Sequence, residues 1–296
     1  MIDIKILREN PELVKANAKR RGCDVDIDLL AAEDQRCLEL TREVEDLRAE
    51  RNRLSKECKD NPEAREAVKE LKISLGEKEK QLAELKAAVA AKMDWLPNFL
   101  APDVPDGAGD QDNAELCQKG NKPKFDFEPL DHQALGEKLG IIDTVRGAKV
   151  AQSGFYYWRG AGAQLTQAMF FWGQQELIKR GFTLFLSPCM AKEQTLYGTG
   201  YLPFFADQTY SIVNEDLALI GTSEQTLVGY HADEVLEAEQ LPFCYTAYTP
   251  CFRTEAGSYG KESRGIFRVH QFHKVELIVF CLPEESEKYH LFCLEC

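Results

Sequence analysis

Two long stretches of the chain carry apolar residues at alternating intervals of three and four positions, first over residues 37–58 and again over residues 68–89. Such spacing is typical of the buried seam of a coiled coil. Asn61 and Pro62 lie between the stretches and suit a helix cap and a first helical position. Because this connection is short, we predict that the two helices pair with each other as an antiparallel hairpin over residues 31–93.

Charged residues occupy most hairpin positions outside the seam. Both helices should therefore expose most of their surface, and we interpret the hairpin as a projecting arm rather than one packed along its length on a domain. Basic side chains cluster near its far end, at Arg51, Arg53, Lys56, Lys59, Arg65 and Lys69. They form the local basic strip that an RNA partner requires, but ion pairs with glutamates of the same helix explain any one of them equally well.

The rest of the pattern divides the chain into a helical N-terminal part over residues 1–96, a linker over residues 97–125 and a globular domain over residues 126–296. The linker is rich in Pro, Gly and Asp and has no apolar periodicity. The domain pattern predicts helices over residues 131–139, 164–180 and 222–231, strands over residues 155–158, 182–186, 204–213, 217–220, 244–253 and 266–280, and short edge elements at 141–143 and 147–151. Because β–α–β alternation is rare, we predict an α+β fold with a mainly antiparallel sheet and helices on one side.

Composition narrows the classes of function. A hydrophobic fraction of 44% and a charged fraction of 29% are ordinary for a soluble protein. No apolar run reaches the length of a membrane span and the N-terminus has no signal pattern, so we expect a cytoplasmic protein without a membrane partner. Ten scattered cysteines indicate reduced thiols. His290, Cys293 and Cys296 lack a second half for a zinc site, so we expect no metal ion held by these side chains. The net charge of −13 argues against a protein surface that binds nucleic acid everywhere. It still allows a local basic strip to bind nucleic acid, because salt screens charges beyond a short distance.

The candidate chemistry lies in residues 251–276, which are predicted to form two strands joined by a long polar, glycine-rich loop. Arg253 and Glu255 are two positions apart, so on a strand their side chains share a face. A guanidinium suits a phosphate, and a carboxylate can accept a hydrogen bond from an exocyclic amine. Phe272 offers a flat apolar face to a base, and Glu276 lies on the same strand. An ordinary cross-strand ion pair is the alternative explanation for the two charged residues.

Three motifs, one of them in this segment and two before it, give the chain a family resemblance. Residues 252–255 (Phe-Arg-Thr-Glu), followed by the loop and by residues 267–272 (Phe-Arg-Val-His-Gln-Phe), resemble the second signature motif of class II aminoacyl-tRNA synthetases. Residues 222–224 (Thr-Ser-Glu), which taken alone suit a helix cap, and residues 197–200 (Tyr-Gly-Thr-Gly) narrow the match. Together with the helical arm, they resemble bacterial-type seryl-tRNA synthetase over essentially the whole chain.

The resemblance implies a reaction in which L-serine and ATP give seryl-adenylate, and the seryl group then passes to the 3′-terminal adenosine of serine tRNA. In this reaction Arg253 is the implied catalytic residue at the α-phosphate of ATP, and Mg²⁺ accompanies the phosphates. The other implied ATP-binding residues are Thr254, Glu255, Val269 and Phe272. The implied serine-binding residues are Thr222, Ser223, Glu224 and Glu276.

The resemblance also implies partners and mobile parts. The arm and its basic strip bind the tRNA. The helix that ends in residues 182–188 resembles the first motif of the class, which implies a homodimer interface around Pro188. Residues 257–265 form a loop that becomes ordered over ATP or the tRNA acceptor end.

Two departures from the family pattern stand out. His273 occupies a position, at the edge of the expected site, where an acidic or polar residue is more usual. The family carries a third, glycine-rich motif further downstream, and this sequence ends at Cys296 before it. We therefore expect an incomplete class II catalytic domain, and the alternative to a serine–tRNA ligase is an incomplete fragment or remnant that retains tRNA binding or dimerisation. A sister synthetase for alanine, threonine or glycine is a further alternative.

Overall fold

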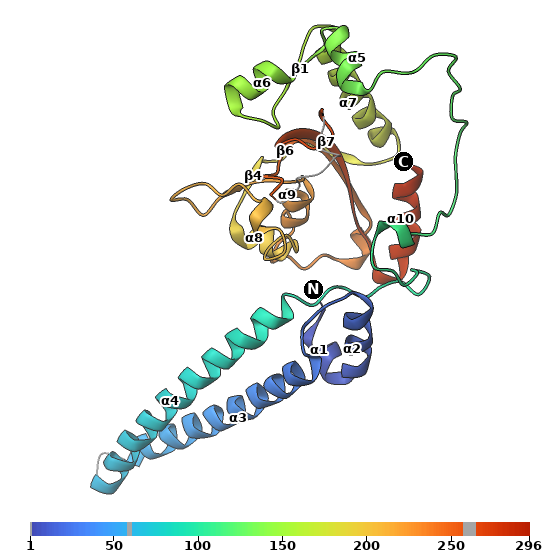
Figure 1. The fold of residues 1–296 in the computed structure, drawn as a ribbon. Coiled ribbons are helices and arrows are strands. Elements are labelled where there is room, and N and C mark those ends of the chain that lie inside the picture. The colour runs from blue at the N-terminus through green and yellow to red at the C-terminus, as the bar shows by residue number, and fades with distance from the viewer. Residues whose placement is uncertain (1, 58–60, 257–264) are drawn as a thin grey trace. The chain divides into compact units, whose positions relative to one another are not determined.

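The computed structural model describes residues 2–57, 61–256 and 265–296 of the chain. The chain falls into two compact units, Met1–Gly120 and Asn121–Cys296. The first unit is helical, and the second combines helices with small β-sheets (Figure 1). Among the described residues, no helix is both long enough and apolar enough to cross a membrane.

Capping residues mark the starts of helices in the first unit. Its elements are α1 (Ile4–Glu9), α2 (Pro11–Arg20), α3 (Ile27–Glu57), α4 (Pro62–Met93) and the 3-10 turn η1 (Asp110–Asp112). The side chain of Asn10 caps α2 by accepting a hydrogen bond from the backbone N–H of Leu13, and Asn61 caps α4 in the same manner. A proline follows each cap at the first helical position, where the helix makes no use of the missing N–H.

α3 and α4 pack against each other as an antiparallel hairpin (Figure 1). The seam positions between them are no more than 9% exposed at Cys37, Leu40, Val44, Val68, Leu75, Leu82 and Val89. The same apolar cluster continues through Leu7, Val14 and Leu30, where the short helices α1 and α2 pack against the hairpin. The coiled-coil hairpin predicted from the spacing is therefore confirmed, and α3 begins a few residues earlier than predicted.

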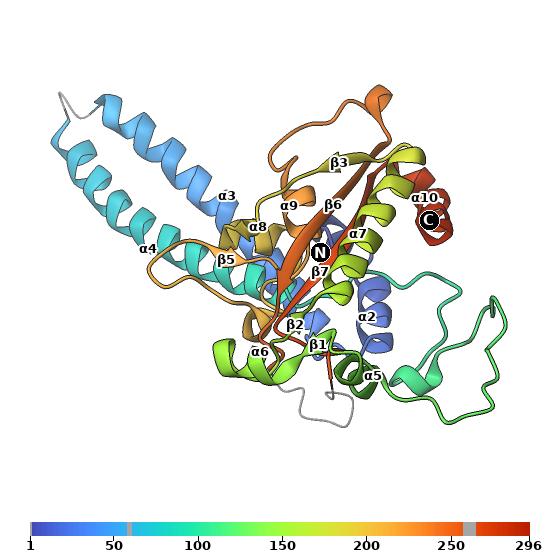
Figure 2. The same cartoon turned by 90° about the horizontal axis from the view of Figure 1, so that it is seen from above.

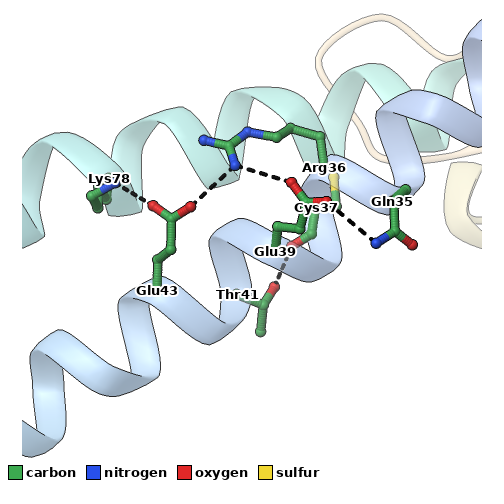
Figure 3. Close-up of polar contacts among 7 residues, drawn as sticks. All are labelled: Gln35, Arg36, Cys37, Glu39, Thr41, Glu43 and Lys78. Carbon is green, nitrogen blue, oxygen red and sulfur yellow. Dashed lines mark hydrogen bonds and ion pairs between the residues drawn. The ribbon is translucent and has the colours of Figure 1, made fainter.

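One seam position carries a lysine, which the structure accommodates through a charge pair. Lys78 Nζ forms an ion pair with Glu43 of the facing helix, and the other oxygen of Glu43 accepts a hydrogen bond from Arg36 Nη1 at 3.1 Å (Figure 3). These two cations hold the pKa of Glu43 below its ordinary value. Because the Lys78 side chain remains 32% exposed, its charge keeps contact with water while it links α3 to α4.

The second unit is an α+β domain. Its helices are α5 (His132–Lys138), α6 (Thr144–Ala151), α7 (Ala161–Lys179), α8 (Glu193–Gly198), α9 (Glu224–Gly229) and α10 (Ser286–Glu295). Its strands are β1 (Ile142–Asp143), β2 (Tyr157–Trp158), β3 (Thr183–Phe185), β4 (Met190–Ala191), β5 (Ala218–Leu219), β6 (Phe243–Phe252) and β7 (Gln271–Phe280). Its 3-10 turns are η2 (Ala206–Gln208), η3 (Ala238–Gln240) and η5 (Pro283–Glu285).

β6 and β7 form the central hairpin of this domain, and β3 lies on the other side of β6 (Figure 2). β7 runs antiparallel to β6 along its full length, whereas β3 pairs with β6 in parallel. The chain passes through α8 and α9 between β3 and β6, and this crossover returns it in the same direction. The main sheet is therefore mixed: its long β6–β7 ladder is antiparallel, as predicted, and β3 adds a short parallel pairing that was not predicted. The pairs β1–β2 and β4–β5 are antiparallel.

Several predicted strand bounds are wrong. Residues 204–209 form turns, including η2, because backbone N–H groups there bond to carbonyls three or four residues earlier. Of residues 210–213, Ser211 forms only an isolated bridge with Ala218. Residues 147–151 belong to helix α6 rather than to an edge element. The long strands are shorter at their facing ends than predicted, so residues 253 and 266–270 lie outside the β6–β7 ladder.

The two faces of the β6–β7 hairpin pack against different helices. On one face, Tyr248 contacts Phe170 of α7, with ring centroids 4.9 Å apart. On the other, Ala247 is buried against Leu227 of α9. Helices therefore cover both faces, not one side as predicted. Glu276 lies directly opposite Ala247 in the register, so the strand alternation places it on the α9 face.

Candidate active site

Backbone hydrogen bonds tie the end of β6 to the turn before α9 and to the start of β7. The N–H of Phe252 donates to the carbonyl of Ile220 at 2.8 Å. The N–H of Arg253 donates to the carbonyl of His270 at 3.0 Å. Three segments that are distant in the sequence therefore meet at one place, and the predicted site residues lie on them.

A chain of polar contacts crosses this place from α9 to β7. The backbone N–H of Glu224 donates to Thr222 Oγ1 at 3.3 Å, and Thr222 Oγ1 donates to Glu276 Oε2 at 2.5 Å. The same oxygen of Glu276 forms an ion pair with Lys274 Nζ. Thr222 is fully buried and the Glu276 side chain is 20% exposed. The arrangement presents a partly desolvated carboxylate, which is a suitable partner for an ammonium group.

Arg253 contacts the turn that carries Thr222 and is held from two sides. Its guanidinium sits over the ring of Phe272, 5.2 Å from the centroid, and Nη2 donates to the carbonyl of Gly221 at 3.4 Å. Contact with an aromatic face orients the planar group. A guanidinium has five N–H donors, so the contact with Gly221 leaves donors for phosphate oxygens.

The surroundings of the site shift the protonation of two more groups. Burial, together with the charge of Glu276, raises the pKa of Glu224, and Lys274 opposes this effect. Burial, assisted by the charge of Glu224, raises the pKa of Tyr201 to about 12. Tyr201 is therefore a neutral hydroxyl near pH 7, and Glu224 protonates more readily than an exposed glutamate.

A small cavity of about 80 Å³ opens next to Arg253. Its walls are formed by Tyr201, Phe205, Gln208, Thr209, Gly221, Gln225, Phe252 and Arg253. Gln225 is almost fully buried, and its Oε1 accepts a hydrogen bond from the N–H of Gly221 at 3.1 Å. This bond fixes the turn whose carbonyl holds Arg253. The cavity offers space for a few water molecules beside the guanidinium.

Two of the predicted site residues, Ser223 and Val269, have buried side chains, and the side chain of a third, Thr254, is bonded to the backbone. Ser223 is fully buried, and among the described residues its hydroxyl has no hydrogen-bond partner. Thr254 donates its hydroxyl to the carbonyl of Asp207 at 2.5 Å and its backbone N–H to the carbonyl of Gln208 at 3.0 Å. Val269 is also buried. The Thr254 side chain therefore fixes turn η2.

Two expectations about the site need correction. Arg253 and Glu255 do not share one face of a strand, because β6 ends before them and Glu255 has a positive φ of 51°. This left-handed backbone breaks the alternation that the prediction assumed. His273 does not lie at the edge of the site, because it stacks on Tyr248 at 5.4 Å on the α7 face, opposite to Glu276. Burial there lowers the pKa of His273.

Two cations of the arm's basic strip form ion pairs with acidic residues of their own helix. Arg53 and Lys69 pair with acidic residues of the same helix at 3.6 and 2.9 Å, as the alternative explanation proposed. Lys56 is exposed near the end of α3. Lys59 and residues 257–264 of the predicted ATP loop lie outside the described residues.

Sequence reasoning missed two residues of the site. Lys274 lies two positions before Glu276, so the alternation of a strand is a signal that could have found it. His270 is different: its Nδ1 lies 3.0 Å from the carbonyl of Arg253 and 3.0 Å from the hydroxyl of Tyr210. These partners are 17 and 60 residues away, and no local pattern indicates such contacts.

Nine described cysteines are free thiols. Burial raises the pKa of Cys244, Cys251 and Cys293, which keeps these thiols protonated near pH 7. Across residues 2–57, 61–256 and 265–296, no three His, Cys, Asp or Glu side chains converge in a way that could hold a metal ion.

Family models match parts of both units. Residues 209–292 match the model described as "tRNA synthetase class II core domain (G, H, P, S and T)". Residues 1–100 match the model described as "Seryl-tRNA synthetase N-terminal domain". The fold and the site therefore define a class II aminoacyl-tRNA synthetase.

Individual relatives narrow the class to one family. The serine–tRNA ligase of Rubrobacter xylanophilus is 40% identical over 98% of this chain and 70% of its own length, and that of Dictyoglomus turgidum is 41% identical over 99% and 71%. The structure of seryl-tRNA synthetase from Pyrococcus horikoshii complexed with ATP has a TM-score of 0.89 at 35% identity, over 100% of this chain and 73% of that one. The chain belongs to the seryl-tRNA synthetase family, as the motifs predicted.

Proposed function

We propose that this chain activates L-serine with ATP to seryl-adenylate and transfers the seryl group to the 3′-terminal adenosine of serine tRNA. One observation carries the proposal: the Glu276 carboxylate, held by Thr222 and Lys274, lies in the same site as the Arg253 guanidinium. An amino acid presents an ammonium and a carboxylate. Glu276 suits the first, and Arg253 suits the phosphate that the second attacks.

The first step joins the two substrates. A carboxylate oxygen of serine attacks the α-phosphorus of ATP, the bond from that phosphorus to the bridging oxygen breaks, and pyrophosphate leaves. Arg253 offsets the negative charge that builds on the α-phosphate, an effect typically worth about 3–4 kcal/mol for one well-placed donor. In the second step a ribose hydroxyl of the tRNA attacks the carbonyl carbon, and AMP leaves. The contribution of the chain is position and charge, not covalent chemistry.

Thr222 and Glu224 are proposed to read the hydroxyl of serine. Thr222 is buried with its own hydroxyl fixed between Glu224 and Glu276. Buried polar groups discriminate strongly, because an alanine substrate would leave the partly buried Glu224 carboxyl without the substrate hydroxyl. Ser223 contributes through its place in the turn rather than through its buried side chain.

The remaining predicted ATP-binding residues surround Arg253. We propose that Phe272 stacks on the adenine, that Glu255 accepts its amino group, and that Thr254 and Val269 shape the surrounding backbone. The solved relative from Pyrococcus horikoshii, whose structure holds ATP, supports a nucleotide at this place. The cation–π contact of Arg253 with Phe272 keeps both groups together before ATP binds.

Mg²⁺ is proposed to arrive with the nucleotide. The described residues offer no protein cage of three metal-ligating side chains. Mg²⁺ in nucleotide sites is usually held by phosphates, waters and one or two carboxylates, so the donor set here fits that mode. The ion would supply charge neutralisation at the phosphates.

The α3–α4 hairpin is proposed as the tRNA-binding arm. The match of residues 1–100 to the family's N-terminal domain supports this role. The cations Arg51, Arg53, Lys56, Lys59, Arg65 and Lys69 remain the candidate contacts. The ion pairs of Arg53 and Lys69 are exposed and weak, so phosphates can replace their acidic partners. The cytoplasm remains the expected compartment.

A homodimer is proposed to form along α7. A groove of about 630 Å³ lies beside this helix, between α5 and β7, and its lining is mainly apolar. Leu165, Met169 and Trp172 of the lining are each at least 60% exposed. A contiguous apolar surface of this kind marks an interaction site. A second copy is the proposed occupant, because α7 leads through β3 to Pro188, where the resemblance implies the homodimer interface.

The function is tested by charging purified tRNA with labelled serine. The full chain is expected to form acid-precipitable seryl-tRNA with serine tRNA and not with alanine tRNA. A variant without residues 37–89 is expected to keep serine-dependent exchange between pyrophosphate and ATP and to lose charging. Loss of both activities would assign the hairpin a structural role instead.

A further inference from the structure

Residues 265–270 lead into β7 but lie outside the β6–β7 ladder, which begins at Gln271. The β6 side of the hairpin reaches this segment at its last residue, where the carbonyl of His270 accepts the N–H of Arg253. Val269 within the segment and Phe272 just after it belong to the proposed ATP site. Another part of the domain must therefore hold the first residues of the segment in place.

His132, on helix α5, makes that contact. Its Nε2 accepts a hydrogen bond from the backbone N–H of Ile266 at 3.1 Å. Its ring packs on Phe267, with ring centroids 4.2 Å apart. Gly265 has a positive φ of 77°, and a Cβ atom there would lie 2.1 Å from Nε2 of His132. The backbone passes the imidazole so closely that position 265 requires glycine.

Helix α5 is itself fixed to the strand that follows it. Asp131 caps the helix, which places His132 at the first helical position. The N–H of Ile141 donates to the carbonyl of Gly136 at 2.9 Å. A Cβ atom on Gly136 would lie 2.5 Å from the side chain of Ile142 in β1, so helix and strand are in close contact. His132 therefore projects from a braced support.

The other end of the segment is held by the same part of the domain. The N–H of His270 donates to the carbonyl of Gly154 at 2.9 Å, and its ring stacks on Phe155 with centroids 5.3 Å apart. Residues 131–158, which form α5, β1, α6 and β2 (Figure 2), thus contact residues 265–270 at both ends. They lie outside both family matches, which cover residues 1–100 and 209–292.

We infer that His132 is a positioning residue for ATP binding: it fixes the backbone of residues 265–267, from which the chain continues to Val269 and Phe272. The identity of the ligand rests on the proposed function, whereas the fixing of residues 265–267 does not. His132 acts through this backbone and not on the nucleotide, because its Nε2 is engaged by Ile266.

The effect is expected to be selective for one substrate. Glu276, the proposed partner of the serine ammonium, is held by the ladder with β6 and by the hydrogen bond from Thr222. These contacts involve neither α5 nor residues 265–267. Loss of the His132 contact should therefore weaken ATP binding and leave serine binding unchanged.

The contact is tested by amide hydrogen exchange in the full chain labelled with ¹⁵N-isoleucine, with the Ile266 signal assigned by Ile266→Val. His132→Leu removes the acceptor, and His132→Gln keeps one near the position of Nε2. Gln133→Ala is the matched control, because it removes an exposed hydrogen bond to Glu137 from the same helix. We expect the Ile266 amide to exchange about tenfold faster in His132→Leu and near the parent rate in the other two. The Ile141 amide should keep the parent rate in all three.

Binding of ATP with Mg²⁺, and separately of serine, is then measured by calorimetry. We expect Kd for ATP to rise about tenfold in His132→Leu and to recover in His132→Gln, with Kd for serine within about twofold of the parent.

An Ile266 amide that exchanges at the parent rate in His132→Leu overturns the inference, as does an unchanged ATP affinity beside a faster amide. Faster exchange of Ile141 with weaker binding of both substrates would show a purely structural role and overturn it too. An Ile266 amide that responds in a chain whose parent binds no ATP leaves the fixing of residues 265–267 standing and contradicts the proposed function instead.

Discussion

The hydroxyl of Thr222 donates a hydrogen bond of 2.5 Å to the Glu276 carboxylate, although 54 residues separate the two positions. The bond joins the turn before α9 to strand β7. The acceptor is Oε2, the oxygen that also pairs with Lys274. A turn that sequence alone presents as a helix cap thereby becomes part of an amino-acid site.

Replacing Thr222 by Val should weaken serine binding. The change keeps the shape of the buried Thr222 side chain and removes its hydroxyl, so the partly exposed Glu276 carboxylate loses a charge-assisted hydrogen bond. Such a loss is worth about 1.5–3 kcal/mol, and we expect KM for serine to rise tenfold or more. Thr222→Ser is the control, because it keeps the hydroxyl. Equal KM values for the two variants would show that the hydroxyl has no part in binding.

His270 is expected to support Arg253 through its backbone. Its Nδ1 lies 3.0 Å from the Arg253 carbonyl, and its backbone N–H donates to Gly154 at 2.9 Å. His270→Leu removes the side-chain contact and should lower kcat about tenfold, with a smaller change in KM for serine. His270→Asn offers a donor at the position of Nδ1 and should recover part of the rate. Steady-state exchange kinetics measure both, and a purely structural role would lower thermal stability in both variants without restoring kcat in the second.

The charge pair between the arm helices predicts a pH-dependent stability. The pKa of Glu43 is lowered by Lys78 and Arg36, so the ionised form is favoured in the folded state. Its contribution is present above the unfolded pKa, about 4.3, and is lost as pH falls through the lower folded value. Glu43→Gln should lower Tm on the order of 1 °C at pH 7, because the pair is partly exposed. The difference should vanish in acid.

Thermal unfolding from neutral pH to about pH 2 checks this prediction. The control is Glu84→Gln, which removes the more distant pair with Lys80 at 3.9 Å on α4. That variant should match the parent at every pH. A Glu43→Gln difference that persists unchanged in acid would assign the effect to packing rather than to charge.

A negative charge in the groove along α7 should prevent self-association. Trp172 is 65% exposed in the single chain, and Trp172→Asp would place a carboxylate in the apolar surface that we propose to be covered by a second copy. Sedimentation velocity should show a dimer for the parent and a monomer for this variant. Ile73→Asp is the matched control, since Ile73 is equally exposed, but on the arm. A parent that sediments as a monomer at all concentrations contradicts the proposed interface.

Much of the fold could be predicted because it depends on local patterns. The three-and-four spacing of residues 37–58 and 68–89 located the hairpin, and the caps at Asn10 and Asn61 located two helix starts. The parallel pairing of β3 with β6 could not be predicted in the same way, because it depends on the path of the chain through α8 and α9. The predicted strand at residues 204–213 was wrong, because turns with local backbone hydrogen bonds interrupt the apolar run there.

In the candidate site too, the features set by local motifs could be predicted and those set by tertiary packing could not. The motifs pointed to Thr222, Arg253 and Glu276, and the structure brings these residues together. The assumption of a continuous strand failed at Glu255, where the backbone turns left-handed. His270 escaped notice because its contacts are set by tertiary packing, which leaves no periodic signal in the sequence.

The most direct test of the central claim is isotope exchange between pyrophosphate and ATP, measured for this chain with serine, alanine, threonine and glycine supplied separately. We predict exchange with serine alone, and its loss in Arg253→Ala, because the α-phosphate then lacks its cation. Exchange that depends on another amino acid would contradict serine activation and indicate a sister synthetase. Exchange with none of the four would contradict activation by this chain and favour a protein that retains tRNA binding or dimerisation without the chemistry.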